Sequence, residues 1–180
     1  MEEFEFKIIL IGDSAVGKTT GASRYTGTEC SQNHVPTIGA SFFRIDYTYN
    51  GKEEHFDLWD TAGQELYRAL IPLYGRDAHA AIIFFSVADR DTFEHVGEWN
   101  EFVSNESSTS CTMLFGNKTD IPERTVTREE AESYAAEHGM LYYEGSAIND
   151  EGIIEMFHAV FNAVIKARDE SKILAKPRRT

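Results

Sequence analysis

Apolar and polar residues alternate in blocks along this chain, and the blocks have the lengths of strands and helices. Residues 80–87 (AAIIFFSV) are apolar on both faces of an extended segment, which is typical of a central parallel strand. In contrast, Phe93, Val96, Trp99 and Val103 recur at helical spacing. Six segments are predicted to be strands: Phe6–Ile11, Ser41–Tyr49, Lys52–Trp59, Ala80–Val87, Cys111–Gly116 and Met140–Glu144.

The segments between these strands contain helix signals. Lys18–Tyr25 is predicted to be a helix that follows a glycine-containing loop. Thr127 and Glu130 form a capping box, and Gly139 is expected to end the helix that this box begins. An apolar stripe from Ile153 to Ile165 predicts a closing helix.

Two long polar segments, residues 26–40 and 60–75, are predicted to be loops, the second with one short helix. Asn50-Gly51 lies between two strand patterns and is a strong signal for a two-residue hairpin. The alternation predicts an α/β fold: a mostly parallel six-stranded sheet, one antiparallel hairpin and helices on both faces. Ligands of such sheets bind beyond the carboxyl ends of the strands, where the loops at residues 12, 60, 117 and 145 begin.

Composition limits the classes of partner. The chain has 180 residues, 42% of them apolar, which suits one globular domain. Its 17 basic and 30 acidic residues give a net charge of −13, so nucleic acid is not an expected partner. Cys30 and Cys111 are expected to be free thiols, and the acidic N-terminus does not resemble a secretory leader. We therefore expect a cytoplasmic protein.

The segment Gly12–Thr19, GDSAVGKT, fits the phosphate-binding P-loop at every fixed position. Glycines allow backbone N–H groups to turn toward phosphates, Lys18 supplies a positive charge for the β and γ oxygens, and Thr19 offers a hydroxyl to Mg²⁺. By itself the loop does not distinguish ATP from GTP, or a kinase from a hydrolase. The predicted phosphate-binding residues of the loop are Ser14, Ala15, Val16, Gly17, Lys18, Thr19 and Thr20.

The segment that begins at Asp60 suits a second set of contacts with phosphate, metal and water. Asp60 ends a strand and suits the second Mg²⁺ anchor of a P-loop site. Gly63 has no side chain, so its N–H can approach a γ-phosphate closely. Gln64 both donates and accepts hydrogen bonds, which suits the orientation of an attacking water. Gln64 and Lys18 are the candidate catalytic residues.

The segment Asn117-Lys118-Thr119-Asp120 follows an apolar strand and predicts a guanine site. A carboxylate can accept two parallel hydrogen bonds, and guanine presents N1–H and its 2-amino group in that geometry, whereas adenine does not. Asn117 can bridge this loop to the phosphate loop, and the aliphatic stem of Lys118 can cover a face of the base.

With these motifs in this order, the chain resembles the Ras superfamily of small GTPases, and the Rab branch in particular, over about residues 5–168. The resemblance implies a small G domain at residues 1–170, followed at 171–180 by the start of a basic, disordered tail. It makes Thr37 a Mg²⁺ ligand that also contacts the γ-phosphate. It also assigns guanine contacts to Ser146, Ala147 and Ile148, and effector contacts to Phe42, Trp59 and Tyr74.

The resemblance further implies a monomeric switch that binds GTP and GDP with Mg²⁺, hydrolyses GTP slowly alone and acts in vesicle traffic. Its expected partners are an exchange factor, a GTPase-activating protein and effectors. The expected location extends to the cytoplasmic face of an internal membrane if a lipidated tail exists. Two alternatives stay open: a GTP-binding scaffold with little hydrolysis, and a P-loop kinase of small molecules.

Several positions depart from the family pattern. Cys30 stands where an aromatic residue usually covers the guanine, and His34 lies near a usual switch tyrosine. Gly145 and Ile148 replace the usual Thr or Cys and the usual Lys of the base loop. Because one aromatic cover is absent, we expect faster nucleotide release than in a typical Rab protein. The histidines have no metal-ligand spacing, so no zinc site is predicted.

Overall fold

The computed structural model describes residues 4–27, 40–61, 75–106 and 109–175. Thr37, Gly63, Gln64 and Tyr74 lie outside these ranges, as do the departures at Cys30 and His34. The strands are β1 (Glu5–Gly12), β2 (Ala40–Tyr49), β3 (Lys52–Thr61), β4 (Ala80–Ser86), β5 (Cys111–Asn117) and β6 (Leu141–Glu144). The helices are α1 (Lys18–Thr26), α3 (Arg90–Glu94), α4 (Val96–Glu106), α5 (Arg128–Glu137) and α6 (Ile153–Ala175).

These strands form one sheet in the order β2-β3-β1-β4-β5-β6. Among them, β2 and β3 pair antiparallel, and the other neighbouring strands of the sheet are parallel. Their hairpin turns at Asn50 and Gly51, whose φ angles of 50° and 77° suit the tight turn that the dipeptide predicts. The expected six-stranded, mostly parallel α/β sheet is therefore confirmed.

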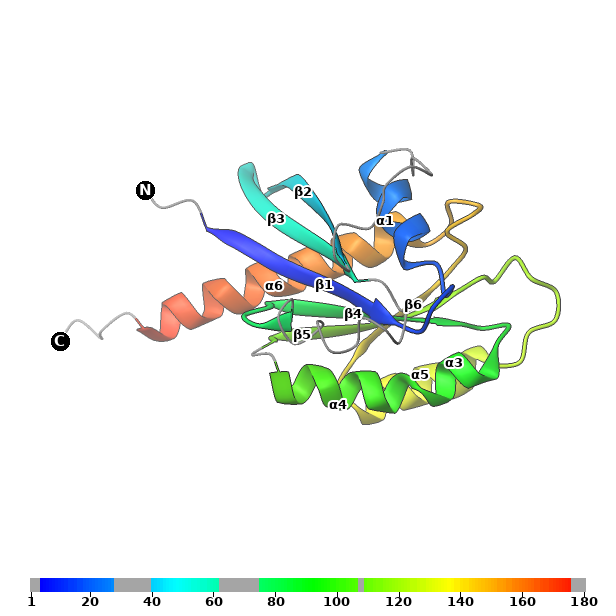
Figure 1. Cartoon of the computed structure of the whole chain (residues 1–180). Coiled ribbons are helices and arrows are strands. Elements are labelled where there is room, and N and C mark those ends of the chain that lie inside the picture. Colours follow the sequence, from blue (N-terminus) through cyan, green and yellow to red (C-terminus); the bar gives the residue numbers. More distant parts are fainter. Residues whose placement is uncertain (1–3, 28–39, 62–74, 107–108, 176–180) are drawn as a thin grey trace.

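Helices cover both faces of the sheet, with α1 and α6 on one side and α3, α4 and α5 on the other (Figure 1). The alternation along β1 explains how both faces become apolar. Ile8 and Leu10 belong to the core under α1 and α6, whereas Ile9 and Ile11 belong to the core under α4 and α5. All four side chains are fully buried, so this part of the strand has no polar face.

The predicted helix signals are found with two differences. Thr127 accepts a hydrogen bond from the Glu130 N–H at 3.2 Å and begins α5, and Gly139 follows its end with φ 66°. The apolar spacing over 93–103 is divided between α3 and α4, with His95 between them. The closing helix α6 extends to Ala175, so residues 171–175 of the expected tail are helical. No glycine or proline interrupts this helix before Pro177.

A buried ion pair fixes α6 against the hairpin. The Arg168 guanidinium donates to both carboxylate oxygens of Glu54 in β3, at 2.6 and 2.8 Å. These two side chains are only 9% and 4% exposed. The hydrogen bonds from Arg168 lower the pKa of Glu54 to about 2, with a further contribution from Lys52.

Glu54→Gln is expected to destabilise the fold by about 3 kcal/mol at pH 7, because it leaves the buried Arg168 guanidinium with only the exposed carboxylate of Asp169 as its charge partner. The folded-state pKa lies below the ordinary 4.5. The contribution is therefore complete above about pH 4.5 and is lost as the pH falls toward 2. Urea unfolding of both proteins at several pH values, with GDP in excess, measures the difference.

Glu170→Gln is the matched control, because the pair of Glu170 with Lys166 is exposed and spans 3.9 Å. Its effect should stay within about 0.5 kcal/mol at every pH. Equal effects of the two variants, or a Glu54→Gln effect that does not shrink in acid, would contradict this account.

Candidate functional site: a nucleotide cavity

The loop between β1 and α1 is shaped by glycines that no other residue can replace without strain. Gly12 has φ 141°, and a Cβ there would lie 2.3 Å from the carbonyl oxygen of Phe84. Gly17 has φ 98°, and its Cβ would lie 2.1 Å from Nδ2 of Asn117. The glycines therefore bring the loop into direct contact with β4 and with the residue that ends β5.

Lys18 begins α1 and is 5% exposed. Its Nζ donates to the carbonyl oxygens of Gly12 and Asp13 at 3.0 and 2.7 Å. Burial lowers the pKa of Lys18 to about 8, although the nearby Asp60 and Asp13 oppose this change. A bound anion would compensate the same cation, so the site favours a negatively charged ligand.

Asp60 and Thr19 meet where β3 ends beside the start of α1. Thr19 Oγ1 donates to Oδ2 of Asp60 at 2.5 Å. Asp60 is 4% exposed, and burial raises the pKa of its carboxyl. Its other oxygen, Oδ1, is buried without a hydrogen-bond partner among the described residues. An unpaired carboxylate oxygen next to a hydroxyl is a donor set that fits Mg²⁺.

Asn117 and Lys118 connect the end of β5 to the phosphate loop. Asn117 Nδ2 donates to the carbonyl oxygen of Val16 at 2.8 Å, and Lys118 Nζ donates to that of Ala15 at 2.6 Å. The bridge that Asn117 was expected to form is thus present in the structure. Its buried side chain fixes the distance between the two loops.

The second base loop follows β6. Ser146 Oγ donates to Oδ1 of Asp120 at 2.7 Å, which orients the carboxylate expected to contact guanine. The Ala147 N–H, expected to face the base, donates to Oδ1 of Asn117 at 3.0 Å. Gly145 packs so closely on the next turn that a Cβ would lie 2.0 Å from the carbonyl oxygen of Glu151. In this chain, glycine therefore suits the position where Thr or Cys is usual.

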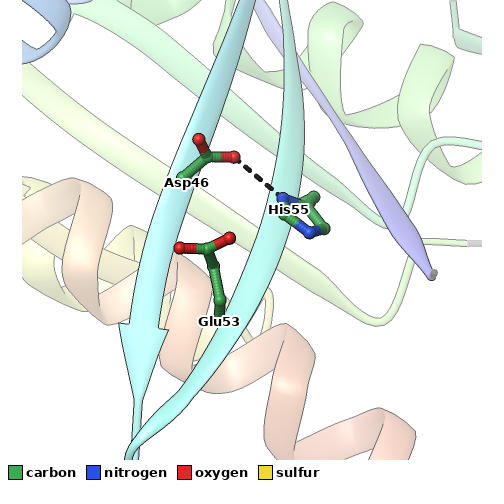
Figure 2. Close-up of side chains that lie close together, drawn as sticks. All are labelled: Asp46, Glu53 and His55. Carbon is green, nitrogen blue, oxygen red and sulfur yellow. Dashed lines mark hydrogen bonds and ion pairs between the residues drawn. The ribbon is translucent and has the colours of Figure 1, made fainter.

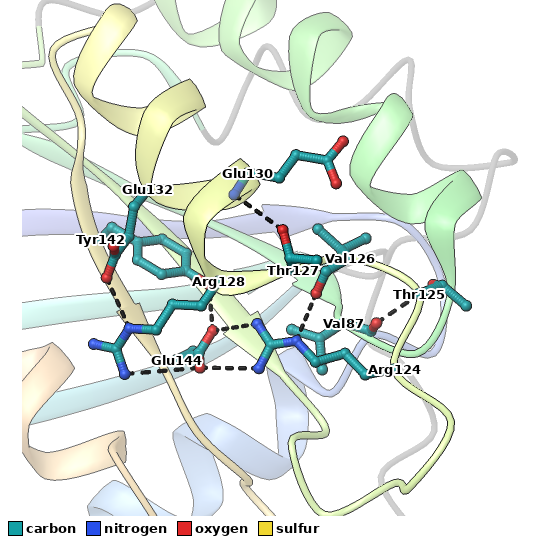
Figure 3. A network of polar contacts seen from close by, with 10 residues as sticks. All are labelled: Val87, Arg124, Thr125, Val126, Thr127, Arg128, Glu130, Glu132, Tyr142 and Glu144. Carbon is teal, nitrogen blue, oxygen red and sulfur yellow. Dashed lines mark hydrogen bonds and ion pairs between the residues drawn. The ribbon is translucent and has the colours of Figure 1, made fainter.

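A polar network holds the end of β6, where this second base loop begins (Figure 3). The Arg124 guanidinium donates to both carboxylate oxygens of Glu144, at 3.0 and 2.7 Å. Its Nε donates to the carbonyl oxygen of Val126 at 2.6 Å, and the Tyr142 hydroxyl donates to Glu144 at 2.6 Å. Arg124, which follows the first base loop (residues 117–120), is thereby tied to Glu144, the residue directly before Gly145.

The phosphate loop and the two base loops surround a cavity of about 390 Å³. Most of the predicted site residues line it, namely Ser14, Ala15, Gly17, Lys18, Thr19, Thr20, Asn117, Lys118, Asp120, Ala147 and Ile148. Val16 and Ser146 are buried behind its wall. Sequence analysis missed Thr61, which also lines the cavity and donates to the carbonyl oxygen of Leu10 at 2.6 Å. Its place directly after Asp60 was the available signal.

The outer face of β2 and β3 carries the predicted effector residues that the structure describes. The rings of Phe42 and Trp59 meet edge to face at 5.1 Å, and Phe42 is 47% exposed. Farther along the hairpin, Asp46 bonds to Nδ1 of His55 at 2.8 Å, and Glu53 lies beside them (Figure 2). Because the Asp46–His55 contact is an ordinary cross-strand pair on an exposed surface, we do not assign a metal to this cluster.

Comparison with known proteins identifies the family. The model of the Ras family matches residues 7–166. The chain belongs to the Ras family. It is 41% identical over 161 residues to the Ras-related protein RABA5e of Arabidopsis thaliana, in an alignment that covers 88% of this chain and 74% of that protein. It is 39% identical over 159 residues to the Ras-related protein Rab-21 of Mus musculus, with coverages of 86% and 70%.

Within the Ras family, this chain is a Rab-type small GTPase, a hydrolase that acts as a switch in vesicle traffic. The kinase and scaffold alternatives are not favoured by these relatives. Members of the family work with regulators and effectors. Among the described helices, none is both long enough and apolar enough to cross a membrane.

Proposed function

We propose that the cavity binds GTP and GDP together with Mg²⁺, and that loss of the γ-phosphate is the event that the switch reports. The observation that carries this proposal is one cavity lined both by the phosphate loop and by Asn117, Lys118 and Asp120. A guanine nucleotide likewise combines phosphate charge with a hydrogen-bonding base edge.

At the phosphate end, the residues from Ser14 to Thr20 present backbone N–H groups at the start of α1, where the helix dipole favours an anion. Lys18 exchanges its two carbonyl acceptors for oxygens of the β and γ phosphates. Charge-assisted hydrogen bonds of this kind are stronger than those to neutral carbonyls, so the exchange favours binding.

The proposed Mg²⁺ ligands are Thr19 and, in the GTP state, Thr37, with Asp60 acting through water. When bound, the ion neutralises charge on the β and γ phosphates. Asp60 accepts a hydrogen bond from the Thr19 hydroxyl in the structure, and this contact holds the hydroxyl oxygen at the site. Gly63 donates its N–H to the γ-phosphate.

At the base end, Asp120 accepts hydrogen bonds from N1–H and the 2-amino group of guanine. Ser146 orients that carboxylate, and the stem of Lys118 lies over the base. Ala147 and Ile148 complete this end of the cavity. A carboxylate placed to accept two hydrogen bonds selects against adenine, whose base lacks that pair of donors.

For hydrolysis, Gln64 orients the attacking water. No arginine in the sequence is assigned to the transition-state charge, so a GTPase-activating protein would supply one. An exchange factor and effectors would contact the two switch loops, predicted at residues 26–40 and 60–75. They would also contact the surface of Phe42, Trp59 and Tyr74. We propose a cytoplasmic monomer without a nucleic-acid partner, which would reach the cytoplasmic face of an internal membrane only if it carries a lipidated tail.

Gln64→Leu is expected to slow single-turnover hydrolysis of bound GTP by about tenfold or more, because leucine cannot orient the water. GTP affinity should change little, since the proposed contact of this side chain is with the water rather than the nucleotide. Phosphate release from preloaded protein measures the rate.

Asn105→Leu is the matched control, because it also replaces a side-chain amide by leucine, at an exposed position of α4 that does not line the cavity. Its hydrolysis rate should equal that of wild type. Equal rates for wild type and Gln64→Leu would refute the assignment of Gln64.

A further inference from the structure

The second base loop, which begins at Gly145, is held by the side chain of Ser146 and by several backbone contacts. Ile148, at its tip, is 63% exposed and has an aliphatic side chain that cannot form hydrogen bonds. Ser146 and Glu151 pair across the loop, with backbone bonds of 3.0 and 2.9 Å. The contacts of its carbonyl groups contribute to the position of this loop relative to the phosphate site.

Arg24, in the last turn of α1, holds two of these carbonyls. Its Nε donates to the oxygen of Ala147 at 3.0 Å, and its Nη2 donates to the oxygen of Ile148 at 2.9 Å. One edge of the planar guanidinium thus contacts two successive peptide groups. Lysine cannot reproduce this fork, because its ammonium group is a single point donor.

Helix α1, which carries Arg24, is packed tightly against the sheet and against α6. Gly21 lets the helix approach the sheet so closely that a Cβ there would lie 3.1 Å from the ring of Phe84. Ala22 is fully buried, and the ring of Tyr25 packs on Phe157 of α6 at 4.7 Å. The side chain of Arg24 therefore projects from a backbone that the core fixes.

The same helix begins with Lys18, which lines the cavity, and carries Arg24 in its last turn. Lys18 belongs to the phosphate site, and Arg24 contacts the second base loop. Ala147 is held from two sides, since its N–H donates to Asn117 and its carbonyl accepts from Arg24. A shift of this residue would move the wall of the cavity at the base end.

We propose that Arg24 is a positioning residue that fixes the distance between the second base loop and the phosphate loop and thereby slows nucleotide release. This inference rests on the proposed function, because it takes the cavity to be the guanine-nucleotide site. Arg24 does not line the cavity, and it acts through the backbone of Ala147 and Ile148.

The test measures release of a ribose-labelled fluorescent GDP from the full chain by stopped flow. Arg24→Ala is expected to release it about tenfold faster, since two charge-assisted hydrogen bonds at a partly exposed site are lost. Arg24→Lys should fall between wild type and Arg24→Ala. Hydrolysis of preloaded GTP in a single turnover should stay within about twofold of wild type, because the phosphate end is unchanged.

Arg90→Ala is the matched control. The Arg90 guanidinium also joins two segments, through Glu130 and the carbonyl oxygen of Thr125, but not at the cavity. Its release rate should equal that of wild type. If Arg24→Ala does not fold, as judged by circular dichroism, the intermediate rate of Arg24→Lys carries the test.

The inference would be overturned if folded Arg24→Ala released GDP at the wild-type rate, or if Arg90→Ala accelerated GDP release equally. A fall in hydrolysis in proportion to the gain in release would also overturn it, because that pattern indicates general damage. A wild-type protein that binds no guanine nucleotide would instead refute the proposed function itself. These failures can therefore be told apart.

Discussion

Lys18→Ala is expected to weaken GDP binding by at least a hundredfold. The lysine is buried beneath the phosphate loop, where its ammonium group donates to backbone carbonyls and lies near two carboxylates. Two charge-assisted hydrogen bonds to phosphate contribute about 3 kcal/mol or more, which corresponds to roughly a hundredfold or greater loss. Isothermal titration with GDP and Mg²⁺ measures the change.

Lys166→Ala is the control for removal of one positive charge, because Lys166 lies on α6 with its side chain 74% exposed. We expect its GDP affinity to match that of wild type. Should Lys18→Ala bind GDP as tightly as Lys166→Ala, the phosphates must lie elsewhere, and the assignment of the phosphate end would be wrong.

The second large effect concerns the base. Asp120→Asn is expected to lower GDP affinity by about a hundredfold, since the amide can no longer accept from both N1–H and the 2-amino group. The same variant should prefer xanthosine diphosphate, whose base has a carbonyl oxygen at position 2. The hydroxyl of Ser146 donates to Oδ1 of Asp120. It would hold the oxygen of the new amide and turn the amino group toward the base.

Asp150→Asn provides the comparison, because Asp150 is an exposed carboxylate in the same loop as Ser146 and does not line the cavity. It should keep the wild-type preference for GDP. Competition between the two diphosphates for each variant measures the ratio directly. An Asp120→Asn protein that still prefers GDP would show that this carboxylate does not read the base.

The motifs at the ends of the strands could be predicted from sequence because local spacing dictates their chemistry. In Gly12–Thr19 the glycines, the lysine and the threonine follow each other at fixed distances, and parallel strands bring their carboxyl ends to one edge. Asp60, Asn117 and Asp120 then follow from their places after apolar strands. The structure unites those three segments at one site.

Contacts between distant side chains were beyond the same reasoning. The carboxylate of Asp13 in the phosphate loop accepts from Trp99 Nε1 of α4 at 2.9 Å, although the two residues belong to separate sequence patterns. Arg24 reaches a loop more than 120 positions away. A pattern of apolar spacing fixes which face of a helix is buried, but it does not fix which polar group lies opposite.

The central claim is that this cavity holds GTP and that the chain cleaves it. Single-turnover release of phosphate from wild-type protein loaded with GTP and Mg²⁺ tests that claim most directly. The account predicts slow but complete conversion to bound GDP, which an activating protein accelerates. Protein that keeps its GTP uncleaved over many hours, or that cannot be loaded with GTP, would contradict it.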